Sequence, residues 1–255
     1  MLPRFPALAA TLLLAVGLAA APAPAAAQVL SAEDTARLRV YYEAIGPAVA
    51  PLTARASIAD LLPPLFRLAT TRSADNPLPA EHRAALLALA LYVNGKDPAR
   101  LIPEARAWRR PPWRRLQLGG RGDLAQHFTI SAAIAATAGA PIAHVIGLYK
   151  EIDDARRGGG FSFSDLLADR AGTTFGETAT SSLESARRLQ TRLTDPLADA
   201  DIMPAVDGLP PDVSEREFTR RYRGGNEAAF RIVVAEIDRR IAALAIFAPP
   251  QAAGR

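Results

Sequence analysis

The chain has 255 residues and a formal net charge of +4, with 30 basic and 26 acidic residues. So small a charge gives no support for a nucleic-acid-binding protein. Because the sequence contains no cysteine, disulfides, thiolate metal ligands, a cysteine nucleophile and lipid attachment through an N-terminal cysteine are all excluded.

The first 27 residues have the pattern of an export signal. Arg4 precedes an apolar stretch from Phe5 to Ala21, and the small residues that follow offer an A-x-A cleavage site ending at Ala27. A membrane anchor is the alternative, but the strongly apolar part is shorter than the ~20 residues that a spanning helix needs. We therefore expect a periplasmic or secreted mature chain that begins near Gln28 and has no transmembrane span.

Helical periodicity runs through almost every apolar segment, whereas alternating runs of Val, Ile and Thr are missing. The sequence therefore predicts an all-α protein, folded as a single irregular helical bundle. We divide it into a signal peptide (1–27), an N-terminal helical region (28–118), a central three-helix unit (119–195), a C-terminal helical region (196–248) and a disordered tail (249–255).

Two helices are expected in the first part of the N-terminal region. Ser31 and Asp34 resemble a capping box that opens a helix to about Ile45, which Gly46-Pro47 would end. Ser57 is a candidate cap for a second helix over residues 58–69, bent or broken by Pro63-Pro64.

Further along the chain, a third helix is expected from Pro79 to Val93, and His82 is expected on its surface. Near the C-terminus, Ser214 and Glu217 form another capping box. Asn226 can cap an amphipathic helix, whose apolar residues are Ile232, Val233, Ile237, Ile241 and Leu244.

The segment between residues 98 and 122 predicts a short helix and an ordered loop, rich in arginine, tryptophan and proline. Its most prominent residues are Trp108, Arg109, Arg110, Trp113, Arg114 and Arg115. Guanidinium groups pair with phosphate or carboxylate, and tryptophan favours interfaces, so an anionic envelope surface is one candidate partner. The alternative is that both tryptophans pack over the helices while the arginines stay solvated.

The central unit aligns polar and small residues on three expected helices, over residues 123–138, 141–156 and 164–193. Spacings of three, four and seven residues give each helix one such face. These faces carry Asp123, His127, Ser131 and Ala135 on the first helix, His144, Gly147, Glu151 and Asp154 on the second, and Asp165, Asp169, Gly172 and Gly176 on the third. The small residues would let the helix axes approach closely.

Carboxylates that face inward must be paired, protonated or bound to a cation. His127, Glu151, Asp154, Asp165 and Asp169 have the donor atoms suited to a divalent metal such as Zn, Mn, Fe or Mg, and helical bundles do build metal sites in this way. In the alternative, His127 hydrogen-bonds a carboxylate, and Arg156, Arg157, Arg170 or Lys150 neutralises the rest. Ser164 fits a helix N-cap better than a nucleophile.

The segments "DLAQHF", "GLYKEIDD" and "FSFSDLLADRAG" resemble the YfiM-like family of predicted periplasmic proteins and lipoproteins, over residues 119 to about 177. The family has no established activity. The resemblance selects Asp123, His127, Lys150, Glu151, Asp154, Ser164, Asp165, Asp169 and Gly172, but not His144. A weaker likeness extends to VanZ-like membrane proteins, although this chain lacks their several long membrane spans.

Together these features predict an exported cell-envelope protein, for which two functions stay open. One is metal-assisted hydrolysis, in which Glu151 or Asp123 acts as the base toward a bound water. The other is a non-catalytic assembly or scaffold protein, in which the same cluster locks the helices together through buried ion pairs.

Overall fold

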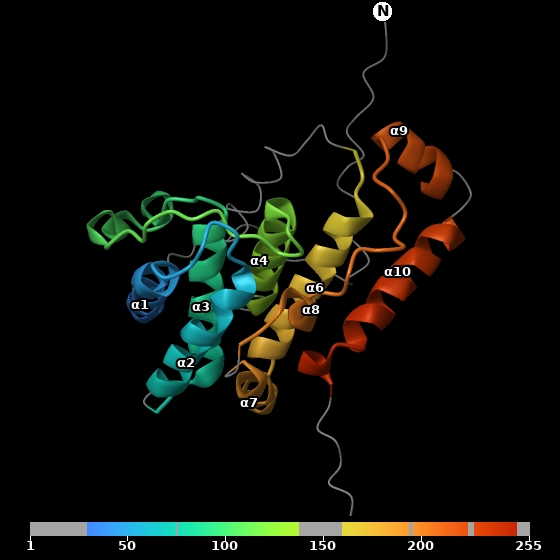
Figure 1. The fold of residues 1–255 in the computed structure, drawn as a ribbon. Helices are drawn as coiled ribbons and strands as arrows, with labels where there is room; N and C mark the ends of the chain where they lie inside the picture. The colour runs from blue at the N-terminus through green and yellow to red at the C-terminus, as the bar shows by residue number, and fades with distance from the viewer. Residues whose placement is uncertain (1–29, 75, 138–159, 194–195, 224–226, 249–255) are drawn as a thin grey trace, which may run out of the picture.

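The computed structural model describes residues 30–74, 76–137, 160–193, 196–223 and 227–248 (Figure 1). Within these ranges every regular element is helical, and β-structure is limited to isolated bridges, which confirms the all-α class for this part of the chain. The predicted signal peptide, tail and middle helix of the central unit lie outside the described residues. No helix in the described ranges is long and apolar enough to cross a membrane.

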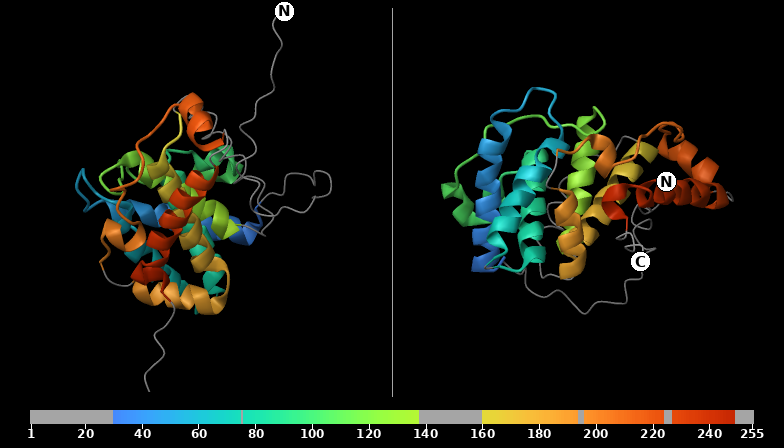
Figure 2. Two further views of the ribbon diagram at one scale, coloured as in Figure 1. Left: turned by 90° about the vertical axis from the view of Figure 1, so that its right-hand side faces the viewer. Right: turned by 60° about the horizontal axis from the view of Figure 1, so that its bottom comes forward.

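The longer helices lie side by side in an order that follows the chain. From left to right in Figure 1 they are α1 (Ala32–Val49), α3 (Leu78–Val93), α4 (Gly122–Thr137), α6 (Phe163–Thr180) and α10 (Glu227–Ala242). The right-hand view of Figure 2 keeps this order from blue to red. The shorter helices are α2 (Leu62–Arg72), α7 (Leu183–Arg192), α8 (Asp199–Ile202) and α9 (Glu215–Phe218), with 3₁₀ turns at Ile58–Asp60, Pro98–Arg100, Pro103–Ala107 and Ala245–Phe247 and a π turn at Thr219–Arg223.

Prolines change the expected helix boundaries near the N-terminus. Ser31 caps α1 as predicted, but the predicted end before Pro47 is wrong, because the helix continues to Val49. Pro47 removes one helical hydrogen bond and its ring crowds the preceding turn, but burial of Val49 against the core favours the extra turn. The predicted second helix is a 3₁₀ turn capped by Ser57, followed by α2, whose first turn holds Pro63, where a missing N–H costs nothing.

The core is built around α3, which packs against α1, α2, α4, α6 and α7. From Ala84 to Tyr92 every side chain of α3 is buried, as the run "ALLALAL" predicts. The prediction that His82 lies on the surface is wrong, because the residue is fully buried. A helix surrounded by neighbours has no solvent face on which a polar residue could lie, so its polar residues need partners inside the protein.

The helix predicted over residues 164–193 is two helices, because the chain breaks at Ser181 and Ser182. The Ser182 hydroxyl accepts a hydrogen bond from the N–H of Ser185 at 3.0 Å, which starts α7. The hydrogen bond of this cap replaces the backbone hydrogen bond that would continue the first helix. The second helix, α7, then packs against α6 and α3.

An aromatic cluster attaches the C-terminal region to the start of α6. It consists of Phe161, Phe163, Phe218, Tyr222 and Phe230, and Phe161 stacks on Phe218 with ring centroids 3.9 Å apart. Arg170 of α6 also pairs with both carboxylate oxygens of Asp238 on α10, at 2.5 and 2.6 Å. On α10 the expected apolar face holds for Ile237 and Ile241, whereas Ile232 is 70% exposed, so its predicted place on that face is wrong.

Candidate functional site

Glycines bring α4 and α6 into close contact. An added Cβ at Gly172 would lie 2.2 Å from the carbonyl oxygen of Phe128, and one at Gly176 would lie 2.2 Å from that of Ala132. No larger residue fits at either place without separating the helices. The predicted role of Gly172 and Gly176 in close approach is therefore confirmed, and this pair of helices makes the most extensive contact among the described elements.

Beside this contact, one histidine of α4 lies between two carboxylates of α6. The His127 Nδ1 atom is 3.1 Å from Asp169 Oδ1, and its Nε2 atom is 3.3 Å from Asp165 Oδ2. The Ser131 hydroxyl donates a 2.8 Å hydrogen bond to the same Asp169 oxygen. The faces predicted on the first and third of these helices therefore meet, and they bring together His127, Ser131, Asp165 and Asp169, the set that we call the His127 network.

The two carboxylates stabilise the protonated imidazole. Burial by itself would lower the pKa of His127, whose side chain is only 14% exposed. Hydrogen bonds to Asp165 and Asp169 and their negative charges outweigh burial and raise the pKa from 6.5 to about 9. At neutral pH the imidazole is therefore a cation, and both of its N–H groups have acceptors.

Arg121 connects the network to the loop before α4, a contact that the sequence interpretation missed. Its guanidinium donates to the Ser164 hydroxyl at 2.7 Å and lies 3.5 Å from Asp165. Gly119 and Gly120 have φ values of 58° and 75°, which glycine adopts without strain, and they form the turn that directs Arg121 toward α6. The sequence signal was the Gly-Gly pair immediately before an arginine and a helix.

Asp123 lies at the edge of the network, because it pairs with Arg121. This hydrogen bond holds the pKa of Asp123 below its usual value despite partial burial, which makes the carboxylate a weak base. The predicted N-cap at Ser164 is wrong, since Ser162 caps α6 by accepting from the N–H of Asp165 at 3.2 Å. Ser164 is one residue inside the helix, buried, and bonded to Arg121 and Ser162.

The other predicted members lie outside the described residues, namely Glu151 and Asp154 together with Lys150, Arg156 and Arg157. Arg170 is described but pairs with Asp238 of α10, so it does not neutralise the network. In the described ranges no group of three or more histidine, aspartate or glutamate side chains has an arrangement that could hold a metal ion. The carboxylates of the site instead face two positive charges, Arg121 and protonated His127. These carboxylates are Asp123, Asp165 and Asp169.

A second buried polar group lies between α1, α2 and α3, and sequence reasoning did not find it. Glu81 is fully buried, and it accepts hydrogen bonds from the Tyr41 hydroxyl and from Arg72 Nε, both at 2.7 Å. Arg37 Nε is 3.3 Å from its other oxygen. Burial and the hydrogen bond to Glu81 raise the pKa of Tyr41 above its usual range. The group joins three helices and has no opening to solvent at Glu81.

The buried His82 is a neutral structural residue. Its Nδ1 atom is 2.9 Å from the Ala179 carbonyl oxygen, and its Nε2 atom is 2.7 Å from the side-chain oxygen of Gln190. Burial lowers the pKa of His82 more than these contacts raise it, so the neutral imidazole donates its single N–H to only one of the two oxygens. The contacts therefore fix α3 against α6 and α7.

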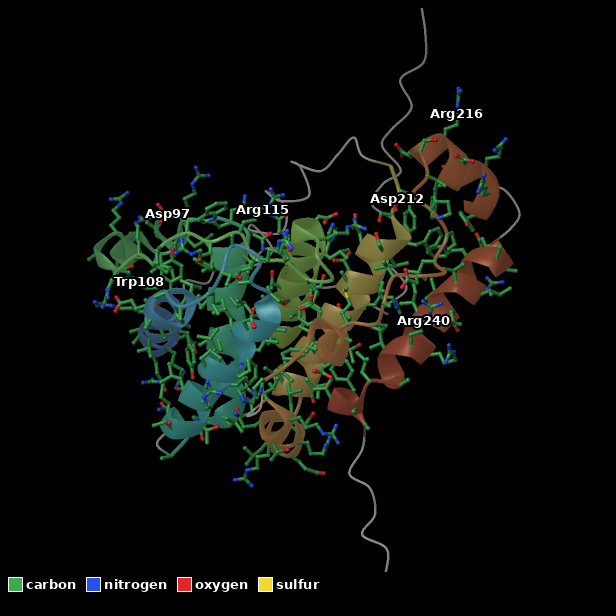
Figure 3. The ribbon with its side chains drawn as sticks, in the orientation of Figure 1. Asp97, Trp108, Arg115, Asp212, Arg216 and Arg240 are labelled. Carbon is green, nitrogen blue, oxygen red and sulfur yellow. The ribbon has the colours of Figure 1, made fainter. Side chains whose placement is uncertain are left out.

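The two tryptophans of the arginine-rich loop have different surroundings. Trp108 is buried and its ring centroid is 6.0 Å from that of Tyr42 in α1, which agrees with the packing alternative (Figure 3). Trp113 is 65% exposed, which does not agree with that alternative.

Comparisons of this chain with protein-family models, with curated proteins and with solved structures found no match. The likeness to YfiM-like and VanZ-like proteins therefore stays a prediction.

Proposed function

We propose that the protein is an exported cell-envelope protein with a non-catalytic, scaffolding role, in which the His127 network fastens α4 to α6. The observation that carries the proposal is the use of both imidazole nitrogens. An imidazolium that donates one N–H to Asp165 and the other to Asp169 has no lone pair left for a metal or for proton abstraction. In this state it bridges two carboxylates on the neighbouring helix.

The arrangement of the helices supports a mechanical role. Gly172 and Gly176 allow the backbones to touch, but glycine contributes no side-chain packing of its own. The ion pairs of His127 therefore supply a specific attachment beside the close contact, and Arg121 adds one between the preceding loop and α6. Such polar networks favour one arrangement of neighbouring helices over others.

A double-mutant cycle tests this proposal. His127→Gln, Asp169→Asn and the double variant should show a coupling of about 1–2 kcal/mol in the free energy of unfolding, as expected for a charged pair in which the histidine is largely buried and the aspartate partly exposed. The control cycle uses Arg188→Gln and Glu184→Gln, an exposed pair on α7 at 2.6 Å, where about 0.5 kcal/mol or less is expected. Equal coupling in the two cycles would contradict the proposed attachment.

The metal-dependent hydrolase is the second candidate, and one observation favours it. Histidines that bind metals commonly donate their other N–H to a carboxylate, as Nδ1 of His127 can do toward Asp169. Nε2 and Asp165 would then be ligands, together with Glu151 or Asp154. This arrangement requires neutral His127, so a metal would compete with the proton that the two aspartates stabilise.

Metal content separates the two candidates. The hydrolase predicts a stoichiometric divalent metal in protein purified from the periplasm, loss of that metal in His127→Ala, and a lower melting temperature after chelation. The scaffold predicts metal-free protein whose melting temperature ignores the chelator. N-terminal sequencing of the same preparation tests export, since a mature chain beginning at Gln28 is expected.

The proposed partner of the scaffold is an anionic envelope surface, which the loop over residues 97–121 would contact. This loop contains seven arginines and two acidic residues. Arg110 is already paired with Asp97, at 3.1 Å to each carboxylate oxygen, and Trp108 is buried, so these two predicted contact residues stabilise the loop itself.

A further inference from the structure

In the loop over residues 97–121, hydrogen bonds to the backbone fix the chain around the exposed Trp113. The hydroxyl of Tyr92, a buried residue of α3, donates a 2.9 Å hydrogen bond to the Pro112 carbonyl oxygen and accepts one of 2.8 Å from the N–H of Arg114. These two groups flank Trp113. One phenol therefore fixes the chain on both sides of a tryptophan that is 65% exposed.

We call residues 112–114 the tip of the loop. Contacts also anchor the loop before and after this tip. Before it, Trp108 packs on Tyr42, and the backbone N–H of Arg109 donates to Glu43 of α1 at 3.2 Å. After it, the backbone of Gln117 exchanges hydrogen bonds with Ala56 and Ile58, both at 3.0 Å. Trp113 is thus exposed on an ordered segment, where contact with a partner requires little further loss of conformational freedom.

The charges around the tip are positive and largely uncompensated. Arg114 and Arg115 directly follow Trp113, are exposed, and have no carboxylate partner in the described part of the chain. Figure 3 shows Arg115 on the same upper side of the molecule as Asp97, away from α2 and α7. An exposed tryptophan beside unpaired arginines is the composition of a surface that contacts the interface of an anionic membrane.

We infer that Trp113, with Arg114 and Arg115, docks this protein on the surface of a bilayer that contains anionic phospholipids. The tryptophan ring enters the headgroup region, and the guanidinium groups contact lipid phosphates. The inference deepens the proposed function by naming the partner of the loop, and it depends on that function only for the presence of a membrane. The His127 network lies on other elements, so either proposal can fail alone.

Vesicle flotation tests the inference with the full mature chain. Phosphatidylcholine vesicles that contain phosphatidylglycerol as a minority lipid should bind the protein, vesicles of phosphatidylcholine alone should not, and added salt should release it. R114A/R115A should lower the partition coefficient roughly 30-fold, and W113A about tenfold. The control R188A/R239A removes the same charge from α7 and α10, and should change binding by less than about twofold.

Fluorescence reports on the tip directly, because the chain has only two tryptophans. In W108F the emission of Trp113 should shift to shorter wavelength on addition of the anionic vesicles, whereas W113F, which keeps buried Trp108, should show no shift. If W108F does not fold, the difference between the wild type and W113F gives the same signal. Y92F should weaken binding several-fold while circular dichroism remains unchanged, because the tip is no longer fixed.

Three results would overturn the inference. The first is no binding to the anionic vesicles, and the second is equal loss in R114A/R115A and R188A/R239A. The third is release by inorganic phosphate at an ionic strength where chloride has no effect, which would indicate a site for free phosphate.

Discussion

The protonation of His127 makes the stability of the protein depend on pH in a specific direction. The folded protein raises the pKa of His127 from 6.5 to about 9, and at about 1.4 kcal/mol per pH unit this corresponds to about 3 kcal/mol of stabilisation. Because the folded state holds the proton more tightly, the stabilisation is complete below pH 6.5. It is lost as the pH rises through about 9.

Urea unfolding of the wild type and His127→Gln, followed by circular dichroism between pH 6 and pH 9.5, checks this prediction. Glutamine has no titration in this range, so the wild-type advantage in unfolding free energy should fall by about 3 kcal/mol across the series. Subtracting the variant removes the contribution of every group that both proteins share. A difference that stays constant with pH, or grows as the pH rises, would refute the assignment of a protonated His127 between Asp165 and Asp169.

Three further predictions concern the packing. Gly172→Ala places a Cβ 2.2 Å from the Phe128 carbonyl oxygen, so α4 and α6 must separate. Thermal unfolding of this variant should show a loss of about 1–3 kcal/mol in stability. The comparison variant Ala135→Gly, on the half-buried side of α4, should cost about 1 kcal/mol. Glu81→Gln leaves Arg37 and Arg72 without their buried charge partner and should cost about 3 kcal/mol in urea unfolding, whereas Glu184→Gln on exposed α7 should change stability by about 0.5 kcal/mol or less. Because burial lowers the pKa of His82, its neutral form stabilises the fold above pH 6.5, and this stabilisation is lost as the pH falls. In acid unfolding curves the wild type should therefore lose stability relative to His82→Gln. Parallel curves for the two proteins would argue against a buried neutral imidazole.

The features predicted best from the sequence are those that follow the periodicity of a helix. The helical class, the extent of the apolar α3 and the shared face of Asp165, Asp169 and Gly172 all follow from spacing, since a period of 3.6 residues decides them locally. The meeting of that face with His127 also followed, because carboxylates that face inward need a partner.

Features that depend on distant partners could not be predicted in this way. His82 is buried because Gln190, 108 positions further along the chain, offers it an acceptor. Glu81 is buried for a similar reason, since its partner Tyr41 is 40 positions earlier. The break at Ser181-Ser182 depends on a serine cap that competes with helical bonds of similar strength, so the local pattern alone does not decide it.

The state of the imidazole of His127 tests the central claim most directly. The chain has three histidines, so ¹⁵N-histidine NMR spectra of the wild type and of His127→Gln assign the signal by difference. The account predicts that both nitrogens of His127 carry protons at pH 7.5 and that the ring titrates near pH 9. A ring with one unprotonated nitrogen at pH 7.5, titrating near 6.5 or bound to a metal, would contradict it.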